Sequence, residues 1–136
     1  FTISIFLSVF NVHVNRLPRG GRVTAVRYYP GEFLDARAAD CSVRNEQFWI
    51  DLTDARTGGL IRIKQIAGAI AQRIVCWLKT EEDVRAGERL GMIQFGSRTE
   101  VSLPVDLVQE AFVKVGDTVH GGSTILLRLK HSERPA

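Results

Sequence analysis

The chain has 136 residues, of which 45% are hydrophobic and 24% charged. This size and composition suit one folded domain with a substantial core, and they exclude a disordered chain. Its apolar runs are far shorter than the ~20 residues of a membrane-spanning helix, so we expect any membrane contact to be peripheral.

The net charge is only +3, but the basic residues are unevenly distributed. Residues 1–31 contain four arginines and no acidic residue. Such asymmetry suits an anionic partner such as a lipid surface, although a merely solvated basic face is a common alternative. The chain has no nucleic-acid motif, so we expect no nucleic-acid partner. The arginines are Arg16, Arg19, Arg22 and Arg27.

Short alternating runs predict a mainly β fold. Residues 1–10 alternate polar and apolar side chains and lack the basic start of a signal peptide, which favours a half-buried strand. Residues 22–28 predict a second strand. Residues 48–52 and 60–64 flank the turn-rich segment 53–59 and predict a hairpin.

One short helix is predicted over residues 65–77, because apolar side chains recur there at spacings of three and four. Gly68 weakens this prediction, and the β-branched residues of 73–77 could return the chain to strand. Four aromatic side chains are expected in the core, with anchoring at a membrane interface as the alternative. They are Tyr28, Phe48, Trp49 and Trp77.

Cys41 and Cys76 are far apart in the sequence and lack the spacing of a metal-binding pair, so we expect free thiols in a reducing compartment. Three histidines form no convincing ligand set either. We therefore predict no metal.

An internal repeat indicates the architecture. Val84, Gly87 and Leu90 recur as Val119, Gly122 and Ile125, each set following an aspartate. The pattern resembles the hammerhead turns of biotinyl and lipoyl carrier domains, in which glycine relieves an obstructed backbone position. We therefore predict a barrel-sandwich-like domain, with Gly96-Ser97 where a carrier would place its modified lysine.

Four motifs stand in a fixed order along the chain: residues 10–16 (FNVHVNR), 65–68 (QIAG), 73–76 (RIVC) and 87–93 (GERLGMI), the last leading to Gly96-Ser97. Together they resemble the shorter form of the phosphatidylserine decarboxylases over residues 6–127. The resemblance implies a peripheral enzyme on the cytoplasmic face of the cell membrane. Its expected reaction converts phosphatidylserine to phosphatidylethanolamine and carbon dioxide.

The resemblance also implies self-processing within a single domain of residues 1–136. The Ser97 hydroxyl would attack the Gly96 carbonyl, and cleavage would leave a β chain of residues 1–96 and an α chain of residues 97–136 that begins with a pyruvoyl cofactor made from Ser97. Glycine at position 96 removes a Cβ that would crowd this attack. The family places an essential aspartate upstream of the matched region, so we expect a truncated chain that lacks part of the family's fold.

The resemblance assigns His13 as the base that accepts the hydroxyl proton and later as a proton donor to the substrate. Arg98 is a candidate contact for the substrate phosphate or carboxylate, and a solvent-exposed arginine is the equal alternative. Two other functions stay open: a pyruvoyl decarboxylase of a soluble amino acid, and a noncatalytic barrel-sandwich binding module. A homodimer also stays open.

Overall fold

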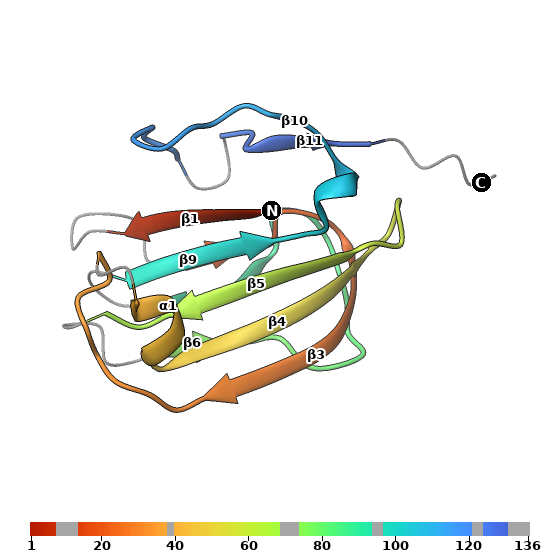
Figure 1. Cartoon of the computed structure of the whole chain (residues 1–136). Helices are drawn as coiled ribbons and strands as arrows, with labels where there is room; N and C mark the ends of the chain where they lie inside the picture. The colour runs from red at the N-terminus through yellow and green to blue at the C-terminus, as the bar shows by residue number, and fades with distance from the viewer. Residues whose placement is uncertain (8–13, 38–39, 69–73, 94–96, 121–123, 131–136) are drawn as a thin grey trace.

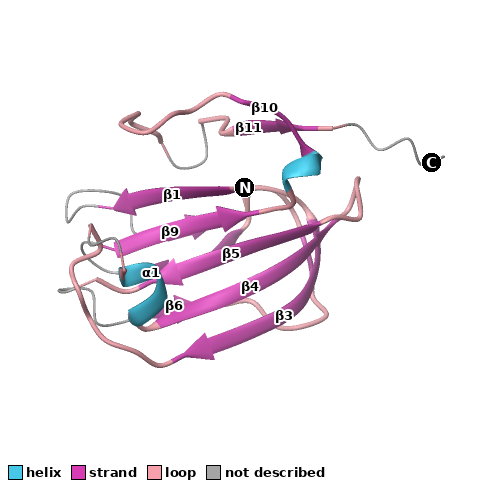
Figure 2. Ribbon diagram, viewed as in Figure 1, coloured by secondary structure: helices cyan, strands magenta, loops and turns pink. Residues whose placement is uncertain are grey.

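The computed structural model describes residues 1–7, 14–37, 40–68, 74–93, 97–120 and 124–130. This part of the chain is mainly β, as predicted, with one short α-helix (Figure 2). The helix, α1, spans Cys41–Arg44, and a single 3-10 turn, η1, spans Val105–Leu107. None of the described helices is long and apolar enough to cross a bilayer.

A six-stranded antiparallel sheet forms the larger layer (Figure 1). Its strands lie in the order β1-β9-β5-β4-β3-β7, so the late strand β9 lies between β1 and β5. Side chains alternate across this sheet, with one face toward the core. The strands are β1 (Thr2–Leu7), β3 (Gly21–Tyr29), β4 (Gln47–Asp54), β5 (Leu60–Ile66), β7 (Asp83–Val84) and β9 (Ser97–Ser102).

A three-stranded sheet with the order β2-β8-β6 forms the opposing layer. The third sheet is a two-stranded hairpin, β10-β11, which lies beside β1 in Figure 1. The strands of these two sheets are β2 (Val14–Arg16), β6 (Ile74–Cys76), β8 (Arg89–Ile93), β10 (Val108–Ala111) and β11 (Leu127–Leu129).

The core lies between the two larger sheets and is divided into two clusters. The larger contains residues from both layers, such as Ile50 and Ile63 from the six-stranded sheet and Leu90 from β8. The smaller consists of Ala67, Ile74 and Ile93. This enclosure of one core by two facing sheets fits the expected sandwich.

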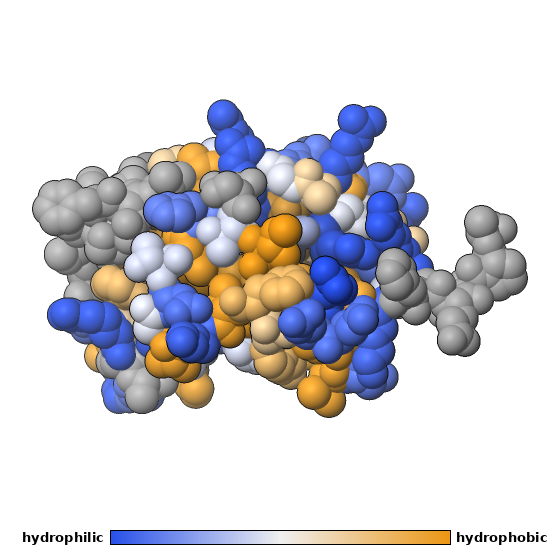
Figure 3. Space-filling view, turned by 90° about the horizontal axis from the view of Figure 1, so that it is seen from above, coloured by the Kyte–Doolittle hydropathy of each residue, from blue (hydrophilic) through white to orange (hydrophobic). Residues whose placement is uncertain are grey.

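The β10-β11 hairpin contributes partly buried side chains to the larger cluster, and the segment that connects its two strands exposes apolar side chains. Seen from this side, hydrophobic atoms gather in the middle of the face, among hydrophilic ones (Figure 3). The exposed apolar side chains of this region include Val105, Phe112, Val115 and Ile125.

The predicted hairpin is confirmed, since β4 and β5 pair from Gln47 with Ile66 to Thr53 with Leu60. The predicted strands over residues 1–10 and 22–28 are confirmed where described, as β1 and β3. The predicted helix over 65–77 is wrong: its first two residues end β5 and residues 74–76 form β6. The β-branched residues at both ends favour strand, and they fill facing layers of the sandwich.

The aromatic residues are less buried than expected. Trp77 and Tyr28 expose 45% and 49% of their surface, so their assignment to the core is wrong. Phe48 does pack against the smaller cluster. Trp49 lies instead on the outer sheet face, where the cationic groups of Arg62 and Lys64 contact its ring.

The first repeat connects β7 to β8 through a turn in which Gly87 has φ of +81°. A positive φ strains any residue with a Cβ, which is why glycine suits this position. Gly122 of the second repeat lies outside the described residues, so the equivalence of the two turns stays a prediction.

Candidate functional site

Ser97 is the first residue of β9 and is fully buried. It pairs with Leu7, the last residue of β1. Figure 1 shows β1 ending and β9 beginning at the same end of the sheet. The predicted partners Gly96 and His13 lie outside the described residues. The described residues nearest His13 in sequence begin at Val14, which pairs with Met92 of β8.

Polar side chains from three strands form a layer inside the sandwich, which we call the polar layer: Asn15 of β2, Gln65 of β5, and Ser97 and Thr99 of β9. The Gln65 Nε2 donates to Asn15 Oδ1 at 2.9 Å, and Asn15 Nδ2 donates to Thr99 Oγ1 at 3.3 Å. Gln65 and Thr99 are also paired across the β5-β9 ladder. Ser97 lies two residues before Thr99, so both side chains point to the same face.

Two buried polar atoms of the described residues have no hydrogen-bond partner, and both belong to the polar layer. They are Gln65 Oε1 and Ser97 Oγ. Leaving a buried polar group unpaired costs about 1–3 kcal/mol. Such groups are rare in folded proteins and call for an explanation in function or in a missing partner.

Gly91 gives the Gln65 amide its room. A Cβ at Gly91 would overlap the Val75 carbonyl oxygen and come within 2.7 Å of Gln65 Nε2. That same nitrogen donates to the Val75 carbonyl at 3.2 Å. The absence of a side chain on β8 therefore lets β6 and the glutamine amide approach each other.

Arg98, the predicted substrate contact, follows Ser97 directly, and strand alternation directs its side chain to the opposite face of the sheet. Its guanidinium lies 3.7 Å from Glu100 Oε2, and both side chains are largely buried. Ser4 Oγ also donates to Glu100, at 2.6 Å. The charge of Arg98 is therefore partly compensated within the protein.

The thiol of Cys41 is buried on α1, and that of Cys76 is half-buried on β6; both are free. Burial raises the pKa of each thiol, and for Cys41 the positive charge of Arg98 opposes this increase. Both cysteines are therefore protonated and weakly nucleophilic at neutral pH.

The basic N-terminal region divides into structural and exposed arginines. Arg19 forms two hydrogen bonds, of 2.9 and 3.2 Å, with the carboxylate of Asp54, whose side chain is 1% exposed. Arg22 lies 3.9 Å from the exposed Asp83, and Arg16 donates to the Gly87 carbonyl. Among the contacts of the described residues, Arg19 is the one of these arginines that pairs with a buried acid.

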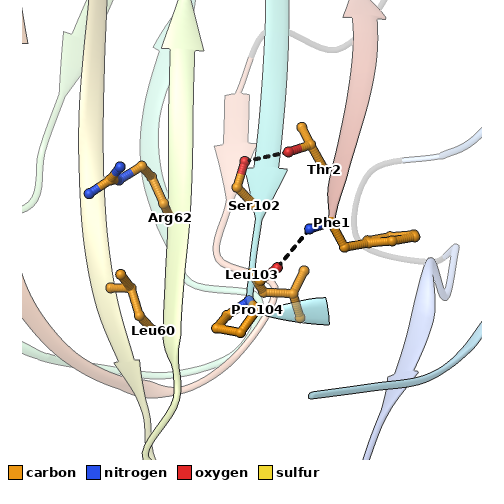
Figure 4. Close-up of a pocket in the computed structure, with 7 residues that line it drawn as sticks. All are labelled: Phe1, Thr2, Leu60, Arg62, Ser102, Leu103 and Pro104. Atoms are coloured by element: carbon orange, nitrogen blue, oxygen red, sulfur yellow. Dashed lines mark hydrogen bonds between the residues drawn. The ribbon is translucent and has the colours of Figure 1, made fainter. Parts of the chain in front are cut away.

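A shallow pocket lies at the other end of β9 (Figure 4). Its lining includes Phe1, Leu60, Ser102 and Leu103, and the N-terminal amine donates to the Leu103 carbonyl there. Ser102 is five residues from Ser97 along the strand, or about 17 Å. The pocket is therefore separate from the candidate site. No cluster of potential metal ligands occurs among the described residues.

The sequence does not predict the contacts of Asn15 and Gln65, although each residue belongs to one of the four motifs. In the helix predicted over 65–77, the Gln65 side chain would have no defined partner. Recognition of the strand would have placed it on the same face as Ile61 and Ile63, where a glutamine among core residues indicates a buried polar role.

Comparison with known proteins gives a consistent result. The sequence profile of the family described as phosphatidylserine decarboxylase matches residues 1–127. A "phosphatidylserine decarboxylase proenzyme" of Rhodopirellula baltica is 46% identical over 125 residues, covering 91% of this chain and 52% of the relative. The proteins of that name from Syntrophus aciditrophicus and Gluconobacter oxydans are 48% and 46% identical, with 57% and 55% of their lengths covered. No solved structure matches.

Proposed function

The chain belongs to the phosphatidylserine decarboxylase family, and we propose that it is part of a precursor that cuts itself between Gly96 and Ser97 and then decarboxylates phosphatidylserine. The chain spans about half the length of the curated relatives that it matches. The observation that carries the proposal is the fully buried, unpartnered hydroxyl of Ser97 at the start of β9, in the dipeptide that the family resemblance marks for cleavage.

The proposed cut uses only atoms of the chain and water. Ser97 Oγ attacks the Gly96 carbonyl carbon, the peptide C–N bond breaks, and the acyl group moves from nitrogen to oxygen as an ester. Elimination then breaks the Ser97 Cβ–O bond, releases Gly96 as a carboxylate, and leaves dehydroalanine. Its hydrolysis gives the pyruvoyl group and ammonia. His13 is the proposed base for the hydroxyl proton, because imidazole titrates near neutral pH.

The surroundings of Ser97 fit a pyruvoyl group. The group has nearly the same number of heavy atoms as the serine it replaces, and the same layer of the sandwich contains the polar side chains of Asn15, Gln65 and Thr99. The pairing of β9 with β1 and β5 would hold the new chain end in place. The ketone of this group supplies an electron sink for the bond to the departing carboxylate.

The remaining residue roles rest on the family resemblance. We propose that His13 returns a proton to the substrate carbon after carbon dioxide leaves. Arg98 stays a proposed contact for the substrate phosphate or carboxylate, and its pairing with Glu100 means that such a contact would have to compete with an internal carboxylate.

We also propose that the protein docks peripherally on an anionic membrane at its cytoplasmic face. The exposed side chains of Arg16, Arg22 and Arg27 support the electrostatic part of this proposal. The two free thiols suit a reducing compartment. A homodimer stays a prediction, which light scattering of the purified protein would test.

The deciding experiment compares the full-length precursor with its Ser97→Ala variant. The unmodified precursor should separate into two pieces on a denaturing gel, and the variant should run as one because alanine has no nucleophile. Mass spectrometry of the smaller piece should show a pyruvoyl start. Continued cleavage between positions 96 and 97 in the variant would refute the mechanism.

The alternatives give different results in the same preparation. A noncatalytic binding module would stay intact even with hydroxylamine, which cleaves the ester. A decarboxylase of a soluble amino acid would be cut but would release carbon dioxide from free serine rather than from phosphatidylserine.

A further inference from the structure

The two unpartnered atoms of the polar layer are chemically complementary. Gln65 Oε1 can only accept a hydrogen bond, whereas the Ser97 hydroxyl can donate one. Both side chains are completely buried. They point to the same inner face, on the neighbouring strands β5 and β9.

The orientation of the glutamine amide is fixed by its other contacts. Its nitrogen donates to Asn15 Oδ1 and to the Val75 carbonyl, and the latter can only accept. A flipped amide would place oxygen against that carbonyl oxygen, so Oε1 is the atom left over. Asn15 also contacts Thr99, through a hydrogen bond of 3.3 Å from Nδ2 to Oγ1.

The fold does not require a glutamine at position 65. An apolar side chain at position 65 would continue the inner row of Ile61 and Ile63 and would leave no oxygen unpaired. A buried acceptor without a partner on β5 and a buried donor without a partner on the neighbouring strand β9 call for an explanation in function.

Gln65 Oε1 and the Ser97 hydroxyl do not bond each other in the structure. We propose that Gln65 is a positioning residue for self-cleavage, whose Oε1 accepts the hydrogen bond of the Ser97 hydroxyl when the cut begins and so aims Oγ at the preceding carbonyl carbon. This inference rests on the proposed function, because it assigns a role in the same cut. Gln65 takes no proton in this role. A separate base removes the proton when the new C–O bond forms and the peptide C–N bond breaks.

The test measures the cutting rate of full-length precursor carrying Gln65→Met, which keeps the length of the side chain and removes the acceptor. Misplacing a nucleophile by about 1 Å costs roughly 100-fold in rate, so we expect a loss of that order. The matched control is Gln47→Met. Gln47 is also buried, but both ends of its amide are already bonded, to Trp49 Nε1 and to backbone carbonyls. It should cut at nearly the unmodified rate.

Hydroxylamine distinguishes positioning from later steps. Because Gln65 acts before the ester forms, Gln65→Met should not accumulate the ester. Hydroxylamine should therefore release as little product from this variant as self-cleavage does. The pH at half-maximal rate should stay unchanged, since no titrating group is removed. A folded Gln65→Met that cuts within about twofold of the unmodified rate, a difference under 0.5 kcal/mol, would overturn the proposal, as would normal accumulation of trapped ester.

Gln65→Glu keeps an oxygen acceptor of the same reach, and burial favours its neutral form, which can also donate. We expect it to retain cutting within about tenfold. If Gln65→Met does not fold, Gln65→Glu is the variant that tests the proposal. A Gln65→Glu protein that folds but is not cut would overturn it. An unmodified precursor that fails to cut would instead refute the proposed function.

Discussion

Leu7 and Ser97 form the last pair of the β1-β9 ladder, so the proposed new chain end lies directly beside a residue of the other piece. Residues of the 1–96 piece flank β9 on both sides, as β1 and β5. We expect the two pieces to stay together after cleavage. They should co-elute from a gel-filtration column in native buffer and separate only in denaturant. Elution of a free 97–136 piece from native, cut protein would contradict this prediction.

His13→Ala should leave a folded precursor that does not cut, because the proposed base is gone. In the unmodified precursor, the cutting rate should fall as the pH becomes acidic, since only neutral imidazole accepts a proton. The measurement is a time course on denaturing gels at several pH values, with circular dichroism to check the fold. A folded variant that cuts at the unmodified rate would remove His13 from this role.

The Arg19–Asp54 pair should contribute to stability above acidic pH. Burial raises the pKa of Asp54, but hydrogen bonds from Arg19 and Thr57 outweigh this effect and hold the pKa below its ordinary value of 3.8. Because the folded pKa is the lower one, the stabilisation is complete above about pH 4 and is lost as pH falls through the folded value.

Asp54→Asn should therefore lower the free energy of unfolding by about 2 kcal/mol at neutral pH, and the difference from the unmodified protein should shrink in acid. Urea titrations at pH 7 and pH 3 measure both. Asp35→Asn is the control: Arg37 lowers the Asp35 pKa to about 2, but both side chains are exposed, so the change at neutral pH should be much smaller. Equal effects of Asp54→Asn at both pH values would contradict the assignment.

Gly91→Ala should destabilise the protein by about 1–3 kcal/mol, because the added methyl group would collide with backbone that cannot move independently. Gly116→Ala is a useful contrast. Gly116 has φ of +95° but open space around it, so only backbone strain of about 1 kcal/mol is expected. The shift of the urea midpoint measures the effect of each substitution. An unchanged midpoint in Gly91→Ala would contradict the close packing of Gly91 against Val75 and Gln65.

Docking on anionic membranes should depend on exposed arginines. Reversing Arg22 and Arg27 to glutamate should weaken binding to phosphatidylserine-containing vesicles by at least about tenfold, at roughly 1 kcal/mol for each basic residue, and added salt should weaken the unmodified protein too. The control reverses Arg56 and Lys114, which changes net charge equally. Cosedimentation measures binding. Equal loss in both double variants would indicate a nonspecific charge effect rather than a docking face.

The sequence alone predicted the strands whose polar and apolar side chains alternate most regularly, such as β3 and the β4-β5 hairpin. It failed over residues 65–77 because Ile66, Ala69 and Ile70 also satisfy helical spacing, and the choice between helix and strand depends on packing against the facing sheet. The polar layer could not be predicted from the sequence either. Asn15 and Thr99 are 84 residues apart, with Gln65 between them in the chain, and their contacts depend on strand register. Ser97 is predicted from the family motif around it, and its role in cleavage stays a prediction.

The position of β9 also sets an order of events during biosynthesis. The burial of Ser97 requires β1 from the start of the chain and β5 from its middle, and pairings between such distant segments form late. A chain still emerging or misfolded would lack the geometry for the cut. If the proposed cut occurs, the appearance of the second piece on a gel would report that folding is complete. Refolding or translation assays could use this readout without an added label.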